Sequence, residues 1–104
     1  MASDHRKYPR VAKPLEAKWR GASGGSMCRI ADISWGGCFV QTVAAPAIGE
    51  PTAVDVEIGG REVRLTGAVV YRETSIGFAM QFDPLSDEQK EVLKELLGAP
   101  PVST

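Results

Sequence analysis

The chain has 104 residues, of which 43% are hydrophobic and 24% are charged, and its formal net charge is −1 at pH 7. These values are typical of one small folded domain, and they exclude wholesale disorder and a protein that is basic overall. No apolar run approaches the roughly 18 residues of a membrane span, and we recognise no signal peptide. We therefore expect a cytoplasmic protein without membrane insertion.

Positive charge is concentrated at the N-terminus. Residues 1–29 contain seven basic and two acidic residues, so the rest of the chain is acidic. Such asymmetry predicts a local site for an anion, although a solvated charged tail would give the same count. Residues 1–14 show no apolar periodicity and end in Pro14, which predicts a flexible arm. Residues 15–98 are predicted to form the domain, and 99–104 a tail.

Apolar and polar residues alternate in a series of short segments after the arm, as in half-buried strands. Gly59-Gly60 predicts a tight hairpin, and Gly67 predicts a bulge or bend within a long strand. We expect most aromatic residues of these strands to face the core. The aromatic residues concerned are Trp19, Phe39, Tyr71, Phe78 and Phe82. The predicted strands cover residues 15–20, 27–31, 38–42, 54–58, 63–71 and 76–82.

Near the C-terminus the spacing of apolar residues changes from that of a strand to that of a helix. Ser86 and Gln89 have the spacing of a capping box, and an apolar stripe follows at helical spacing until Gly98. This pattern predicts one amphipathic helix that covers an open end or face of the sheet structure. A helix that binds a partner is the alternative.

Residues suited to catalysis are nearly absent. His5 is the only histidine and lies in the predicted arm, where nothing would orient it. Cys28 and Cys38 lack the spacing of a zinc site and are expected to be small buried side chains. We therefore predict neither catalytic nor metal-ligating residues and no cofactor, so the chain is not expected to be an enzyme.

The first motif is Arg6-Lys7-Tyr8-Pro9-Arg10, which places two guanidinium groups in the arm. A guanidinium can pair with a phosphate or with the O6/N7 edge of guanine, and it can also stack on a base. Taken alone, this motif is weak because paired arginines are common in charged tails.

The second motif is Asp32-Ile33-Ser34-Trp35-Gly36-Gly37, between two predicted strands. Asp32 and Ser34 are at even-numbered positions, like Cys28 and Ile30. Alternate residues of a strand share a face, so a strand that continued through this segment would place all four on one face. An ionised aspartate can accept the N–H donors of guanine, and Gly36 and Gly37 allow close approach of an anion. An ordinary turn uses the same residue types.

Together the motifs resemble those of the PilZ domain family, whose members bind the bacterial second messenger cyclic di-GMP. The resemblance covers roughly residues 5–97 and includes the order and spacing of both motifs. It implies an all-β fold, a six-stranded antiparallel β-barrel with a C-terminal α-helix. It also implies that the ligand lies on the outer surface of the barrel and that the arm wraps over it.

Carried across residue by residue, the resemblance assigns ligand-binding roles to the two motifs. Arg6 and Arg10 would clamp guanine edges and phosphates, and Asp32 would read a guanine. Ser34 would support phosphate or base contacts, and Gly37 would shape the turn.

Five further residues are predicted to make secondary contacts: His5, Lys7, Trp35, Gly36 and Arg72. His5 occupies a junction associated in the family with binding of one ligand or an intercalated pair, and it leaves that stoichiometry open. Either Tyr71 or Arg72 could stack on guanine. Trp35 either flanks the site or packs over a barrel end, and packing is favoured for so large a ring.

The expected function is therefore that of a cyclic di-GMP receptor that signals by changing its interaction with an unidentified effector protein. The alternative is an adaptor of the same fold that does not bind nucleotide. A barrel that binds a nucleic-acid polymer is disfavoured by the net charge and by the lack of exposed aromatic platforms.

Overall fold

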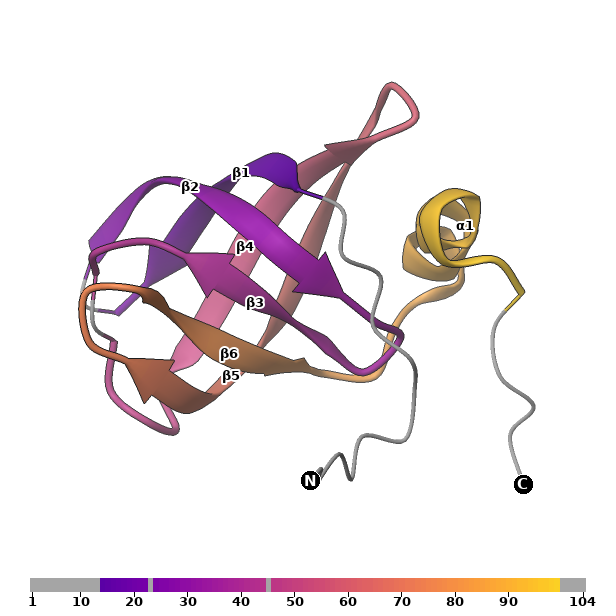
Figure 1. Ribbon diagram of the computed structural model, residues 1–104. Coiled ribbons are helices and arrows are strands. Elements are labelled where there is room, and N and C mark those ends of the chain that lie inside the picture. The colour runs from indigo at the N-terminus through magenta and orange to yellow at the C-terminus, as the bar shows by residue number, and fades with distance from the viewer. Residues whose placement is uncertain (1–13, 23, 45, 100–104) are drawn as a thin grey trace, which may run out of the picture.

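A computed structural model describes residues 14–22, 24–44 and 46–99. Six antiparallel strands close into a barrel in the order β1-β2-β3-β6-β5-β4, followed by one helix (Figure 1). The predicted fold class is confirmed, while the predicted arm and tail lie mostly outside the described residues. The elements are β1 (Leu15–Gly21), β2 (Gly24–Ile33), β3 (Gly37–Gln41), β4 (Pro51–Ile58), β5 (Arg61–Glu73), β6 (Gly77–Phe82) and α1 (Asp87–Leu97).

The barrel core follows from the alternation of side chains along each strand. In β4, Val54, Val56 and Ile58 are buried. The rings of Trp19 and Phe78 meet edge to face, with centroids 5.7 Å apart. The core also satisfies the indole N–H, because Trp19 Nε1 donates a hydrogen bond to Thr52 Oγ1 at 2.5 Å. A polar group this deep would otherwise destabilise the fold.

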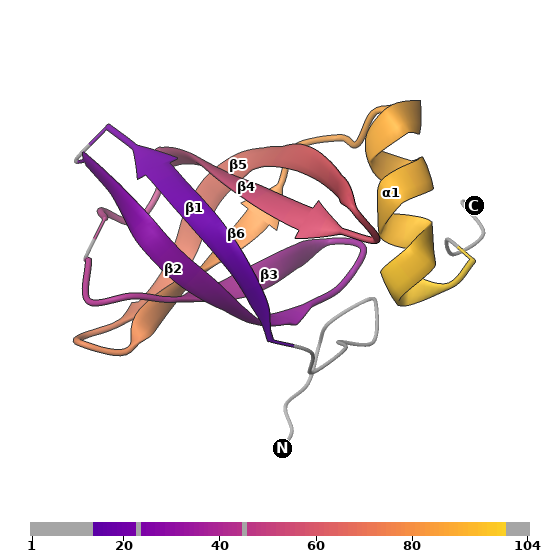
Figure 2. The ribbon, with the colours of Figure 1, turned by 90° about the horizontal axis from the view of Figure 1, so that it is seen from above.

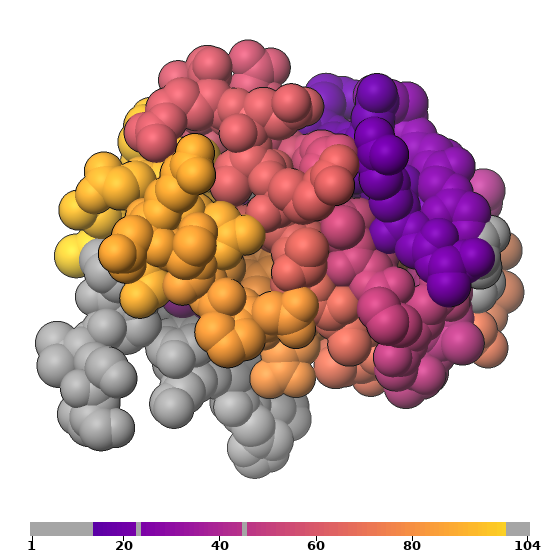
Figure 3. Space-filling model, turned by 180° about the vertical axis from the view of Figure 1, so that it is seen from behind, coloured from indigo at the N-terminus to yellow at the C-terminus, as the bar shows by residue number. Residues whose placement is uncertain are grey.

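Helix α1 lies across one end of the barrel, as the sequence predicts (Figure 2). Ser86 forms the predicted capping box, since Gln89 N donates to Ser86 Oγ and Ser86 N donates to Gln89 Oε1. Val92 and Leu93 are buried in the same core as the strands. Seen from behind, the helix and the strands beside it form one continuous surface (Figure 3). The apolar stripe is therefore largely used within the chain.

Two local predictions for the strands need correction. A bulge or bend was the prediction for Gly67, and no bulge lies there: Gly67 pairs in regular register with Thr52 and Phe82, and a Cβ would overlap the backbone oxygen of Gln81. The bulge of β5 lies at Val70, between the pairs Val69–Met80 and Tyr71–Ala79. Ile76 precedes β6 in a turn and is 49% exposed. Periodicity alone does not locate either feature, because both depend on the neighbouring strand.

The expectation for the aromatic residues holds for Trp19 and Phe78, and also for Phe82, which is only partly buried but packs against the core. It does not hold for Tyr71, which is 53% exposed, or for the partly buried Phe39 on the outward side of β3. A six-stranded barrel encloses one face of each strand, and aromatic residues on the other face remain at the surface.

No helix in the described ranges is long and apolar enough to cross a membrane. The same residues contain no group of histidine, cysteine, aspartate or glutamate side chains that could hold a metal ion.

Candidate functional site

The connection between β2 and β3 is a tight turn held by Ser34. Its backbone N–H donates to the Gly37 carbonyl oxygen at 2.8 Å, and its hydroxyl donates to the same oxygen at 3.3 Å. Gly36 N donates to Ser34 Oγ at 3.2 Å. Ser34 is only 4% exposed. Its hydroxyl therefore shapes the turn, as in the ordinary turn that the sequence offers as the alternative for this motif.

Gly36 and Gly37 join the turn to β6. Phe82 N donates to the Gly36 carbonyl oxygen at 2.8 Å, and Gly37 pairs with Gln81 across the strands. A Cβ at Gly37 would overlap the backbone oxygen of Met80. The requirement for glycine at this position thus comes from close strand packing.

Asp32 does not lie on the face that simple parity predicts. Ile30 pairs with Val40 and Asp32 pairs with Phe39, so Ala31 is an extra residue in β2 and forms a bulge. After the bulge, Ile33 is fully buried and Asp32 is half-buried. The predicted common face with Cys28 and Ile30 is therefore wrong, because the bulge turns the Asp32 side chain away from the core.

Asp32 begins a line of paired residues that crosses four strands. It pairs with Phe39, Phe39 pairs with Ala79, and Ala79 pairs with Tyr71. Directly paired residues of antiparallel strands carry their side chains on the same face. We call these four residues the outer row. A carboxylate at one end and a phenol ring at the other thus flank a partly buried phenylalanine and a small alanine.

A second bulge places Tyr71 in the outer row. Val69 is buried and has the same sequence parity as Tyr71, but the extra residue Val70 turns Tyr71 outward. Arg72 lies outside the outer row. Its Nη1 donates a hydrogen bond to the Pro46 carbonyl oxygen, at 3.2 Å, in the loop between β3 and β4. Of the two residues predicted to stack, only Tyr71 lies in the outer row.

Trp35 sits in the turn between Ser34 and Gly36 and packs against the core. Its Nε1 is buried and has no hydrogen-bond partner in the described part of the chain. The packing role favoured from the sequence agrees with this position. The predicted site residues His5, Arg6, Lys7 and Arg10 lie outside the described residues.

Phe39 and Ala79 were not recognised from the sequence. Phe39 lies two residues beyond Gly37, on the outward side of β3, and Ala79 separates the buried Phe78 and Met80. The available signal was the alternation in β6, which marks Ala79 as outward. Pairing between β3 and β6 then places it beside Phe39, and this pairing is not local in the sequence.

Strong electrostatic interactions occur elsewhere on the barrel. Asp55 on β4 accepts hydrogen bonds from Arg64 Nε at 2.7 Å and Arg64 Nη2 at 3.1 Å. Arg20 Nε lies 3.4 Å from the same carboxylate. The hydrogen bonds from Arg64, followed in size by its positive charge and that of Arg20, lower the pKa of Asp55 against the opposing effect of partial burial.

Both cysteines are buried, and neither forms a disulfide. Burial, together with the negative charge of Glu16, raises the pKa of Cys28 to about 11. A thiol with so high a pKa is almost entirely protonated at neutral pH and is a poor nucleophile. Cys28 therefore matches the structural role predicted for it.

The outer row offers an acceptor, an apolar floor and an aromatic ring. Such an arrangement can hold a flat heterocycle with N–H donors on one edge. It provides no acid–base pair and no activated nucleophile.

Comparison with solved structures shows that other proteins share this fold. The chain resembles the crystal structure of the PilZ domain of CeSA from a cellulose-synthesizing bacterium, with 17% identity and a TM-score of 0.69 over 86% of this chain and 94% of that one. It also resembles the Bacillus subtilis inhibitor of motility (MotI/DgrA), with 14% identity and a TM-score of 0.65 over 88% of this chain. The chain spans about half of the latter, with 49% covered.

No curated protein matches the sequence. The two structural likenesses establish the fold. The model of the PilZ domain family matches residues 4–99, which is nearly the whole chain. PilZ domains are typically receptor or adaptor domains without enzymatic activity, and cyclic di-GMP binding is a property at the level of the family. This chain therefore belongs to the PilZ domain family.

Proposed function

We propose that this chain is a cyclic di-GMP receptor whose ligand lies on the outer row. The observation that carries the proposal is the pair of bulges at Ala31 and Val70, which turn Asp32 and Tyr71 outward onto one line. Bulges re-aim side chains and are common beside functional sites. The family supplies the ligand class, and the outer row supplies groups that suit a guanine base.

Each group of the outer row has a role in this proposal. Ionised Asp32 accepts the N1–H and N2–H donors of a guanine, an edge that adenine does not present. Phe39 and Ala79 form the floor under the base, and the Tyr71 ring stacks on a guanine. In the arm, Arg6 and Arg10 are proposed to bind guanine edges and the two phosphates.

Signalling would follow from a change in binding to an effector protein, and a cytoplasmic location is proposed for both. An effector responds only if the ligand binds the two states of the receptor with different affinity. An arm that closes over the ligand would provide this difference, because it creates a surface that the free receptor lacks.

An adaptor that does not bind nucleotide is the second candidate. It is favoured by the internal roles of Ser34 and Gly37, whose hydrogen bonds and close packing give the fold its own reason to contain them. The two candidates differ in one property, which is whether cyclic di-GMP binds.

Isothermal titration calorimetry with cyclic di-GMP tests the proposal, with cyclic di-AMP and GTP as controls. Saturable binding that is selective for cyclic di-GMP supports the receptor, and the molar ratio distinguishes one bound molecule from an intercalated pair. A folded protein that gives no heat of binding with cyclic di-GMP would contradict the receptor and favour the adaptor.

A further inference from the structure

Strand β2 is longer than the part of it that β3 covers. It pairs with β1 from Gly24 to Ile30 but with β3 only from Arg29 to Ile33. Among the described strands, residues 24–28 thus have a neighbour on one side only. We call residues 24–28 the open edge. Figure 2 shows β2 and β3 separating toward the end of the barrel that lies away from α1.

The hairpin register shows which backbone groups face outward at the open edge. The pair Gly21–Gly24 closes a two-residue loop, so these two residues exchange hydrogen bonds. Hydrogen-bonded pairs alternate with non-hydrogen-bonded pairs along an antiparallel ladder. Gly25 and Met27 belong to the non-hydrogen-bonded pairs, so their N–H and C=O groups point away from β1. Arg29 continues this series and pairs with β3. The open edge therefore presents two donors and two acceptors.

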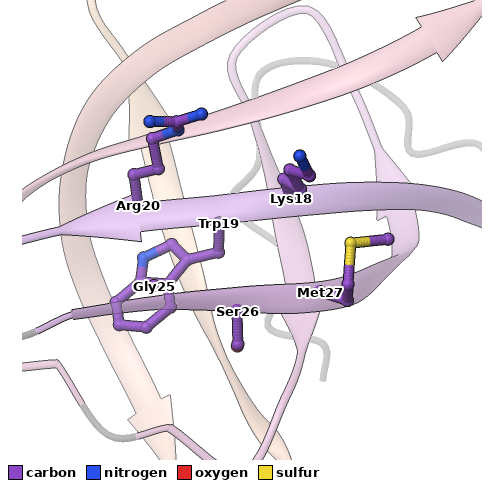
Figure 4. A pocket seen from close by; sticks show the side chains of 6 residues that line it. All are labelled: Lys18, Trp19, Arg20, Gly25, Ser26 and Met27. Carbon is purple, nitrogen blue, oxygen red and sulfur yellow. The ribbon is translucent and has the colours of Figure 1, made fainter.

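Two hollows flank the open edge, and the exposed side chain of Met27 lines both. The first, of about 290 Å³, lies along the hairpin (Figure 4). The second, of about 360 Å³, lies where β3 leaves β2. Residues lining the first are Lys18, Trp19, Arg20, Gly25, Ser26 and Met27. Residues lining the second are Glu16, Met27, Cys28, Arg29 and Gln41.

The charge of the first hollow indicates the chemistry of an occupant. Lys18 and Arg20 line this hollow, and no carboxylate does. No carboxylate of the described chain lies within ion-pair distance of the Lys18 ammonium group. Arg20 contacts Asp55, but its side chain remains 60% exposed. A second copy of this chain would bring the same cations toward one another, whereas acidic side chains would pair with them.

We propose that the open edge binds an extended acidic segment of a partner protein by strand addition. The backbone of that segment pairs with Gly25 and Met27, and its acidic side chains lie beside Lys18 and Arg20. Side chains that alternate along the added strand enter the two hollows. This docking site uses neither the outer row nor the arm, so it does not depend on nucleotide binding.

A synthetic peptide that alternates valine and aspartate over seven residues is a suitable probe, used with the full chain. We expect saturable binding in fluorescence anisotropy, with a threefold or greater loss of affinity in Lys18→Glu. Amide exchange followed by NMR should slow at Gly25 and Met27. Met27→Pro removes one outward donor and should weaken binding at least tenfold, which is more than Met27→Leu, a variant that changes the side chain but keeps the donor. Proline is tolerated at a strand edge when its nitrogen faces solvent.

Two N-methylated peptides keep the test independent of how Met27→Pro folds. One carries methyl groups on the odd residues and the other on the even residues, and strand addition requires that only one of them lose binding. The proposal is overturned if both peptides bind equally, if the unmethylated probe does not bind, or if the edge instead forms a dimer of this chain in sedimentation measurements.

Discussion

Asp32 and Tyr71 lie on one line across the outer face of the barrel, at opposite ends of the outer row. Three strand steps of roughly 5 Å each separate them along the curved wall of the barrel. In a regular strand each would share the face of a buried neighbour, Ile30 or Val69. One extra residue in β2 and one in β5 turn both side chains outward. Two independent irregularities thus converge on one surface.

Asp32→Asn should reduce selectivity for guanine. The amide replaces one acceptor oxygen with a donor, which opposes the N–H groups of guanine. We expect the ratio of affinities for cyclic di-GMP and cyclic di-AMP to fall at least tenfold in calorimetric titrations. Asp87→Asn, on α1, is the matched control and should leave the ratio unchanged. Equal ratios in Asp32→Asn and the parent protein would remove Asp32 from base recognition.

Tyr71→Ala should weaken cyclic di-GMP binding by about 1–3 kcal/mol if the ring stacks on a base. Tyr71→Phe keeps the ring and should bind nearly as the parent does. Arg72→Ala is informative for comparison because Arg72 donates to the Pro46 carbonyl oxygen outside the outer row. If calorimetry shows a larger loss of cyclic di-GMP affinity in Arg72→Ala than in Tyr71→Ala, Arg72 and not Tyr71 is the residue that stacks on guanine.

Arg6→Ala and Arg10→Ala should each weaken binding severely. Each lost bidentate contact removes roughly 1–3 kcal/mol, which is about a fivefold to 150-fold change in Kd. Lys13→Ala removes a positive charge from the same N-terminal segment without altering the paired arginines, and it should have a much smaller effect. Parent-like affinity in both arginine variants would contradict the role of the arm.

Much of the fold follows from local signals in the sequence. Alternation predicts the six strands, the pair Gly59-Gly60 predicts one hairpin, and the spacing of Ser86 and Gln89 predicts the start of the helix. Each signal is contained within a few neighbouring residues. The closed barrel itself was inferred from resemblance, because strand order depends on contacts that periodicity does not encode.

The candidate site is less predictable from the sequence for the same reason. The motif marks Asp32, but neither the bulge at Ala31 nor the one at Val70 leaves a recognisable local pattern. The strand pairings that bring Phe39 and Ala79 between Asp32 and Tyr71 are long-range. Ser34 is different, because the residue types of its motif already allow an ordinary turn, and its hydrogen bonds agree with that interpretation.

Asp55 should make the fold less stable in acid. Because the pKa of Asp55 is lowered in the folded protein, its charge stabilises the fold. This stabilisation is complete above the pKa of the unfolded carboxyl, near 3.9, and is lost as the pH falls through the lower pKa of the folded state. Asp55→Asn should reduce the free energy of unfolding by about 1 kcal/mol at pH 7. In urea titrations this difference should shrink as the pH falls below the pKa of the unfolded carboxyl. A difference that is independent of pH would exclude the charge as its cause.

Backbone NMR of the full chain during titration with cyclic di-GMP shows whether the ligand lies on the outer row. We expect the largest shift changes at Asp32, Phe39, Ala79 and Tyr71, with little change at Lys18 and Asp55 on the other side of the barrel. Changes centred on β1 and β4, or none at saturating ligand, would contradict it.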